Sequence, residues 1–172
     1  MIGNTSGSVE QTLGKILAPY LKDPSNAFVI SSDFAHWGTR FRYTYYRPSL
    51  KVDEAINLSN SAKAPKAPPI HESIKAVDFE CIGACETGSH DAWLNCLEAN
   101  GNTVCGRHPI GVIMAAMKDV RQSSDAGQGV SDAATSRSAD SSFRFIRYER
   151  SSEVERVGDS SVSYASAFAA IT

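Results

Sequence analysis

An aspartate and a histidine, Asp33 and His36, follow a short apolar run at residues 28–30. The run is rich in β-branched residues, so it predicts a strand that ends in polar groups. In open α/β sheets, ligands bind at the carboxyl ends of strands, because the loops there gather side chains from several elements. Asp33 and His36 therefore stand where binding or catalysis is expected. The alternative is structural: Asp33 caps a helical turn, and His36 bonds a backbone carbonyl.

A reactive thiol is predicted at Cys105. Pro109 and the apolar face that follows it predict a buried helix that begins at Arg107 or His108, so Cys105 precedes a helix N-terminus. The positive end of the helix dipole, with Arg107 nearby, stabilises a thiolate and makes Cys105 a nucleophile or a soft metal ligand. Arg107 and His108 are candidate pocket residues or anchors of the loop. The structural alternative for Cys105 is a small buried residue in a tight turn.

Arginines alternate with aromatic residues after His36. Arg40 and Arg42 are candidate contacts for a phosphopeptide, because a guanidinium group binds phosphate through two hydrogen bonds. Arg47 and the neighbouring tyrosines are expected to extend this exposed cluster. The alternative is a single strand or loop packed over the core.

The remaining cysteines and histidines indicate no site. Cys81 and Cys85 stand four residues apart on one predicted helical face, where burial in the core is the main interpretation and a metal pair the alternative. The four cysteines include no CxxC pair, and thiols stay reduced in the cytosol. His71 and His90 have no neighbours in the sequence that suggest a ligand set.

The elements that position these residues alternate between helices and strands, which is typical of an α/β fold. Periodicity predicts helices over 8–22, 74–85 and 90–97 and a further helix from Arg107 or His108. Strands are predicted at 28–30, 143–148 and 161–171. The proline-rich segment 58–69 and the Ser, Asp, Ala and Gly segment 122–142 are expected to be flexible insertions.

Composition indicates one globular domain of 172 residues with 42% hydrophobic residues and a net charge of −2. No basic block occurs, so we expect no nucleic-acid partner. No apolar run approaches the length of about 20 residues that spans a bilayer, so we expect no membrane segment. The expected location is the cytoplasm, with the nucleus as an alternative.

Three blocks carry a resemblance to a known family. They are residues 31–46, which begin Ser-Ser-Asp-Phe-Ala-His-Trp-Gly, residues 105–111, Cys-Gly-Arg-His-Pro-Ile-Gly, and residues 159–165, Asp-Ser-Ser-Val-Ser-Tyr-Ala. Together they span nearly the whole chain and resemble the Memo family. The resemblance implies an α/β fold like that of class III extradiol dioxygenases, with a sheet flanked by helices. Residues 1–172 would form the C-terminal part of that single domain.

The resemblance also implies a site. The family's pocket combines two histidines from the N-terminal half with a cysteine, an aspartate and a histidine that match Cys105, Asp33 and His36. Imidazole and thiolate together suit iron(II), copper or zinc. A redox-linked metal protein of signalling or cell motility is implied, binding iron or copper. A thiolate replaces the carboxylate of the 2-His-1-carboxylate pattern, so competent dioxygenase activity is not expected.

The chain is expected to be a fragment, because nothing in it corresponds to the two upstream histidines. Metal binding would then be weak. An incomplete sheet would expose an edge and apolar surface, which favours non-specific self-association. Two alternatives stay open: a non-enzymatic phosphopeptide-binding adaptor that uses Arg40 and Arg42, and a thiol enzyme that uses Cys105 with His108 or His36.

Overall fold

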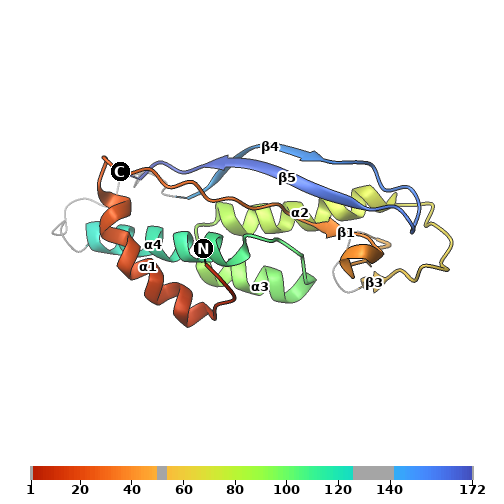
Figure 1. Cartoon of the computed structure of the whole chain (residues 1–172), viewed down its shortest axis with the longest axis horizontal. Coiled ribbons are helices and arrows are strands. Elements are labelled where there is room, and N and C mark those ends of the chain that lie inside the picture. The colour runs from red at the N-terminus through yellow and green to blue at the C-terminus, as the bar shows by residue number, and fades with distance from the viewer. Residues whose placement is uncertain (1, 50–53, 126–141, 172) are drawn as a thin grey trace.

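The computed structural model describes residues 2–49, 54–125 and 142–171. Helices and antiparallel strands are mixed in this part of the chain, which confirms the predicted α/β class. The helices are α1 (Gly7–Lys22), α2 (Ile70–Glu86), α3 (His90–Asn100) and α4 (Arg107–Asp125). They lie on one side of a long two-stranded ribbon formed by β4 (Arg144–Arg150) and β5 (Ser161–Phe168), as Figure 1 shows.

Helices α2, α3 and α4 form where the apolar periodicity predicts them. In α2 the residues on the predicted face are all buried: Ile74, Val77, Cys81, Ile82 and Cys85. Helix α3 begins at a Ser89 cap, whose hydroxyl accepts a hydrogen bond from the Ala92 amide. The prediction that Cys81 and Cys85 are buried in the core is therefore confirmed.

Helix α1 is where it was predicted, but its buried face is different. Glu10, Gly14 and Ala18 are buried, whereas Val9, Ile16 and Tyr20 are exposed. The reason is the close crossing with α4, since a Cβ at Gly14 would lie only 2.7 Å from the Ala115 Cβ. Small residues let the two helices approach, and the larger apolar side chains are left outside the contact.

The strand predicted at residues 28–30 is wrong. These residues belong to no strand, and the first strand, β1, is His36–Trp37. Phe28 and Ile30 pack against the core, while Val29 is 95% exposed. A strand needs a neighbouring backbone to pair with, and in the described residues no strand lies beside 28–30. β1 pairs with β5, which gives an antiparallel sheet in the order β1-β5-β4.

The second sheet is a small hairpin-like pair, β2 (Tyr45–Tyr46) with β3 (Ile56–Asn57). A 3₁₀ turn, Thr39–Phe41, separates β1 from β2. The segment 58–69 contains no helix or strand and is tied down by the Tyr46 hydroxyl, which donates to the Pro68 carbonyl. Of the insertion expected at 122–142, residues 122–125 extend α4, and residues 126–141 lie outside the described residues.

Two apolar clusters form the core. One lies between α2, α3 and α4 and includes Phe34, Trp93 and Met114, and the other surrounds Trp37 and Tyr46. The segment 33–37 contributes to both clusters, so its position is determined from two sides. Among the described residues, no helix combines the length and apolar character that crossing a membrane requires.

Candidate metal centre

Asp33, His36 and Cys105 come together although 72 residues separate the first from the last. One ligand atom from each of the three side chains lies within 4.8 Å of the other two. The Asp33 and His36 side chains are 44% and 22% exposed, and Cys105 is exposed. The Asp33 carboxylate lies 4.0 Å from His36 Nε2. The group therefore faces solvent.

Backbone hydrogen bonds hold the two halves of this group together. The Asp33 amide donates to Cys105 Sγ at 3.1 Å, and the Cys105 amide donates to the Asp33 carbonyl at 3.2 Å. The Gly106 amide donates to Ser32 Oγ at 2.9 Å. A Cβ at Gly106 would collide with Ser32, so glycine is required for this close approach. Gly106 thus allows the Cys105 loop to pack directly against the segment that carries Asp33.

The imidazole of His36 is oriented for metal binding. Its Nδ1 faces two backbone carbonyls, Phe34 O at 2.9 Å and Thr103 O at 3.1 Å. Carbonyl oxygens only accept hydrogen bonds, so the neutral ring carries its proton on Nδ1. The lone pair of Nε2 then faces Asp33. A second nitrogen bonded to a carbonyl is the usual arrangement of a metal-binding histidine.

The buried carboxylate of Asp78, on α2, binds the segment that contains His36. Asp78 accepts hydrogen bonds from the Ala35 amide at 3.1 Å, the Asn102 side chain at 2.8 Å and the Tyr148 hydroxyl at 2.9 Å. Burial raises the pKa of Asp78, and these hydrogen bonds oppose the rise. One side chain thereby connects the loops before His36 and before Cys105 to α2 and β4.

The donor set fits a borderline or soft metal ion. Bond lengths of about 2.0 to 2.3 Å place two ligand atoms of one ion about 3 to 4.5 Å apart, close to the observed spacing. One thiolate, one imidazole and one carboxylate suit iron(II), copper or zinc better than magnesium or calcium. Asp33, His36 and Cys105 could therefore hold such an ion with small side-chain shifts.

His108 and Arg107 lie in a different environment. His108 Nδ1 is 2.7 Å from Glu10 Oε1, and the other oxygen of Glu10 is 2.7 Å from His90 Nε2. Glu10 and His90 are each 1% exposed. Arg107 is half-buried in the first turn of α4, and its carbonyl accepts the Trp93 indole N–H.

Sequence reasoning missed this buried cluster of Glu10, His90 and His108. Its members are 80 and 98 residues apart, and no local pattern relates them. The one sequence signal is Gly111, where a Cβ would collide with the Glu10 carboxylate. That signal has meaning only after the crossing of α1 and α4 is known.

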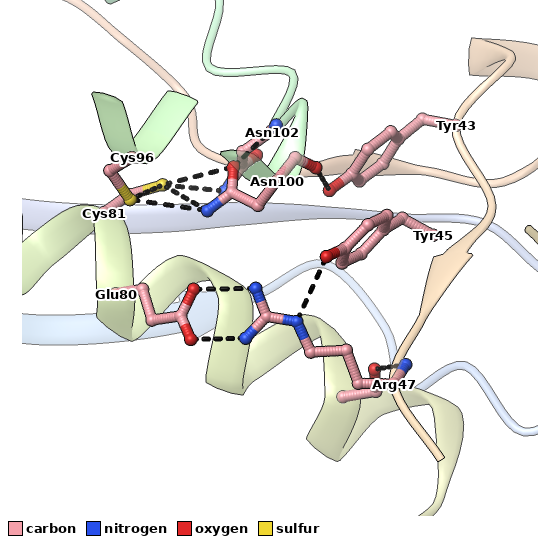
Figure 2. A network of polar contacts seen from close by, with 9 residues as sticks. Tyr43, Tyr45, Arg47, Glu80, Cys81, Cys96, Asn100 and Asn102 are labelled. Atoms are coloured by element: carbon pink, nitrogen blue, oxygen red, sulfur yellow. Dashed lines mark hydrogen bonds and ion pairs between the residues drawn. The ribbon is translucent and has the colours of Figure 1, made fainter. Parts of the chain in front are cut away.

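The arginine cluster is divided by the fold. Arg40 and Arg42 are exposed, and Arg40 lies over the Phe41 ring. The expected exposure of Arg47 is wrong, because Arg47 is 0% exposed. It forms a bidentate ion pair with Glu80 and also donates to the Tyr45 hydroxyl, as Figure 2 shows. Its guanidinium group therefore binds residues of the protein itself.

An apolar groove of about 540 Å³ lies beside the segment that leads to Asp33. Its walls come from α4, the ribbon β4–β5 and residues 21–34, with Phe28, Ile30, Met117, Phe145 and Phe168 among them. The groove is a surface for apolar contact, separate from the three ligand atoms.

Comparison with known proteins agrees with the sequence blocks. The model of the family described as Memo-like protein matches residues 1–168. The chain belongs to this family. A MEMO1 family protein of Schizosaccharomyces pombe is 39% identical over 170 residues, which cover 98% of this chain and 50% of that protein.

Relatives from other organisms show the same coverage. MEMO1 family protein MHO1 of Saccharomyces cerevisiae is 35% identical over 99% of this chain and 51% of its own length. Protein MEMO1 of Homo sapiens is 38% identical over 96% of this chain and 45% of its own length. The chain thus spans about half the length of these curated relatives.

Proposed function

We propose that this chain belongs to a metal-binding, redox-linked protein that holds iron or copper through Asp33, His36 and Cys105. The observation that carries the proposal is the convergence of three different donor groups within 4.8 Å. The orientation of His36 by two carbonyls supports it. Iron and copper exchange single electrons, and this is the chemistry that the ion would supply.

The chain's own groups have separate tasks in this proposal. Cys105 supplies the soft ligand, and the Asp33 amide that donates to its sulfur stabilises the thiolate. His36 Nε2 supplies the imidazole ligand, and the Asp33 carboxylate coordinates the ion or orients His36. Three ligands leave further coordination positions for water or a partner, so we expect weak binding.

We do not propose dioxygenase activity. The cluster in the described residues contains one imidazole, one thiolate and one carboxylate, whereas ring-cleaving iron sites use two imidazoles and a carboxylate. Membership of the Memo-like family is the basis for placing the metal in signalling or cell motility. The four free cysteines support a reducing compartment such as the cytoplasm or nucleus.

Metal titration tests the proposal. Replacing the soft ligand in Cys105→Ser, or the imidazole in His36→Ala, should weaken binding of iron(II) and of copper by at least about tenfold. Anaerobic calorimetry and metal content after gel filtration would measure the loss. His71→Ala is the matched control, because His71 bonds the Val154 carbonyl outside the cluster. Unchanged affinity in Cys105→Ser would reject the site.

A thiol enzyme that uses Cys105 beside His36 is the weaker alternative. The exposure of Cys105 supports it. A bound metal ion and an alkylating reagent would compete for the Cys105 sulfur. If iron(II) or copper protects Cys105 from the alkylating reagent, the metal-binding function is favoured.

A phosphopeptide-binding adaptor is the second candidate, and the exposure of Arg40 and Arg42 supports it. Arg40 lies within the 3₁₀ turn and Arg42 caps its C-terminal end, so both guanidinium groups face solvent at one turn, where they could bind a phosphate. The double variant Arg40→Ala with Arg42→Ala should lose capture of phosphotyrosine peptides in a pull-down. Arg147→Ala with Arg156→Ala is the control, since these side chains are 72% and 83% exposed elsewhere. Equal capture by both variants would exclude the adaptor site.

A further inference from the structure

Two cysteines that the metal site does not use face each other between α2 and α3. Cys81 Sγ and Cys96 Sγ are 3.6 Å apart. Figure 2 shows the two side chains side by side. Cys81 is 0% exposed, whereas Cys96 is partly exposed. The pair therefore joins a fully buried cysteine to a partly exposed one.

Side-chain amides surround the two sulfurs. The Asn100 amide nitrogen is 3.4 Å from Cys96 Sγ and 3.6 Å from Cys81 Sγ. The Asn102 amide nitrogen is 3.4 Å from Cys81 Sγ. The Asn102 amide also bonds Asp78, and the Asn100 side-chain oxygen accepts the Asn102 backbone N–H, so both donors are held in place. Such donors stabilise negative charge on sulfur.

The pKa values of the two thiols shift in opposite directions. In the fully protonated pair Cys96 donates to Cys81, and once Cys96 ionises the Cys81 thiol donates to it instead. This hydrogen bond lowers the pKa of Cys96, and the Asn100 amide and the Arg47 guanidinium lower it further. The same hydrogen bond and burial raise the pKa of Cys81. Cys96 is thus the more acidic thiol of the pair.

We propose that Cys96 is a peroxide-reactive modification site and that Cys81 is its resolving thiol. The Cys96 thiolate attacks one oxygen of hydrogen peroxide, the O–O bond breaks, and Cys96 becomes a sulfenic acid while the second oxygen leaves as water after protonation. Cys81 sulfur then attacks Cys96 sulfur. The S–O bond breaks, a second water leaves with the Cys81 proton, and a disulfide forms. The two sulfurs together supply the two electrons that reduce the peroxide.

The geometry permits the second step with a small movement. A disulfide bond is about 2.05 Å long, so the sulfurs must approach by about 1.5 Å. Bond formation would remove the thiols that Asn100 and Asn102 contact. The Tyr43 hydroxyl donates to the Asn100 backbone carbonyl at 3.1 Å. A shift of Asn100 on oxidation would therefore move a hydrogen-bond partner of the segment that follows His36.

Peroxide oxidation followed by peptide mapping tests this proposal. The full chain carrying Cys105→Ser is treated with hydrogen peroxide, remaining thiols are blocked with N-ethylmaleimide, and the digest is analysed by mass spectrometry. The substitution removes the exposed thiol that would compete. We expect a Cys81–Cys96 cross-linked peptide, reversed by dithiothreitol. A further Cys81→Ser change should leave Cys96 as a sulfenic acid that dimedone labels.

Cys85→Ala in the same background is the matched control, because Cys85 is a buried cysteine one turn further along α2. It should form the cross-link as the parent does. Two results in the parent would overturn the proposal: Cys96 labelled by dimedone or over-oxidised without a cross-link, or Cys96 still reduced at peroxide concentrations that oxidise Cys105 in the unsubstituted chain. The parent measurement decides the question even if Cys81→Ser fails to fold.

Discussion

Glu10 joins three helices through its side chain alone. It lies on α1, and its two oxygens bond His90 of α3 and His108 of α4 at 2.7 Å each. A carboxylate that is 1% exposed has lost its hydration, and the two imidazoles replace it. The bonds are therefore costly to break, because the groups left behind stay buried without partners.

Removing this carboxylate should strongly destabilise the protein. We expect Glu10→Ala to lower the free energy of unfolding by about 3 to 5 kcal/mol, since it leaves the buried His90 imidazole without its carboxylate partner and a cavity beside Gly111. Urea unfolding followed by circular dichroism would measure it. Glu98→Ala, at an exposed position on α3, should change stability by less than about 0.5 kcal/mol. Equal effects of the two substitutions would contradict this role for Glu10.

At the scale of elements, Asp78 connects α2 to β4 and to the segments before β1 and before α4. Burial raises the pKa of its carboxyl group above the unfolded value of about 3.9. The folded state then binds the proton more tightly than the unfolded state does. The contribution of Asp78 to stability is therefore greatest below the unfolded pKa and is lost as pH rises through the folded pKa.

The amide substitution Asp78→Asn isolates this effect. The introduced amide oxygen can accept the Ala35 and Asn102 donors, and its nitrogen can donate to the Tyr148 hydroxyl, which then donates to Ser163 at 3.0 Å. We expect the free energy of unfolding of the parent to fall relative to the variant as pH rises above the unfolded pKa of about 3.9, by about 1.4 kcal/mol for each pH unit that separates the folded pKa from the unfolded one.

Chemical denaturation at several pH values would measure the difference between the two proteins. The control is Asp91→Asn, an exposed carboxylate on α3, for which the difference from the parent should show little dependence on pH. A difference between parent and Asp78→Asn that is constant with pH would show that burial does not shift the titration of Asp78.

At the scale of the whole molecule, two surfaces could take part in self-association. The free edge of β4 carries four charged residues among its seven, which disfavours pairing with another strand. The apolar groove is less protected, since Val29 is 95% exposed and Phe168 is 51% exposed, and its charged lining residues are Lys22 and Asp23. We therefore expect any self-association to use the groove in preference to the sheet edge.

Charges placed at the groove should reduce association. We expect the chain to sediment faster as its concentration rises, and the double variant Val29→Lys with Phe168→Lys to weaken this dependence. Sedimentation velocity over a range of concentrations would measure it. Ile56→Lys is the control, because Ile56 is 49% exposed and lies outside the groove. A parent chain that sediments at one rate over the whole range would contradict this assignment.

The sequence by itself determined the helices and the family. The apolar faces of α2 and α4 repeat at helical spacing, so local pattern is sufficient to locate them. The blocks around Asp33, His36 and Cys105 are continuous stretches, and they identified the family that the comparison with known proteins then confirmed. These features depend on residues that are neighbours in the chain.

Only the tertiary structure decided which residues meet. Residues 28–30 have strand-forming side chains, yet they pair with no strand, because pairing depends on a partner backbone. Arg47 reads like Arg40, yet it is buried against Glu80. The partners of Glu10 and the sulfur facing Cys96 come from other helices. Such contacts join residues distant in sequence, and no local periodicity encodes a distance between two elements.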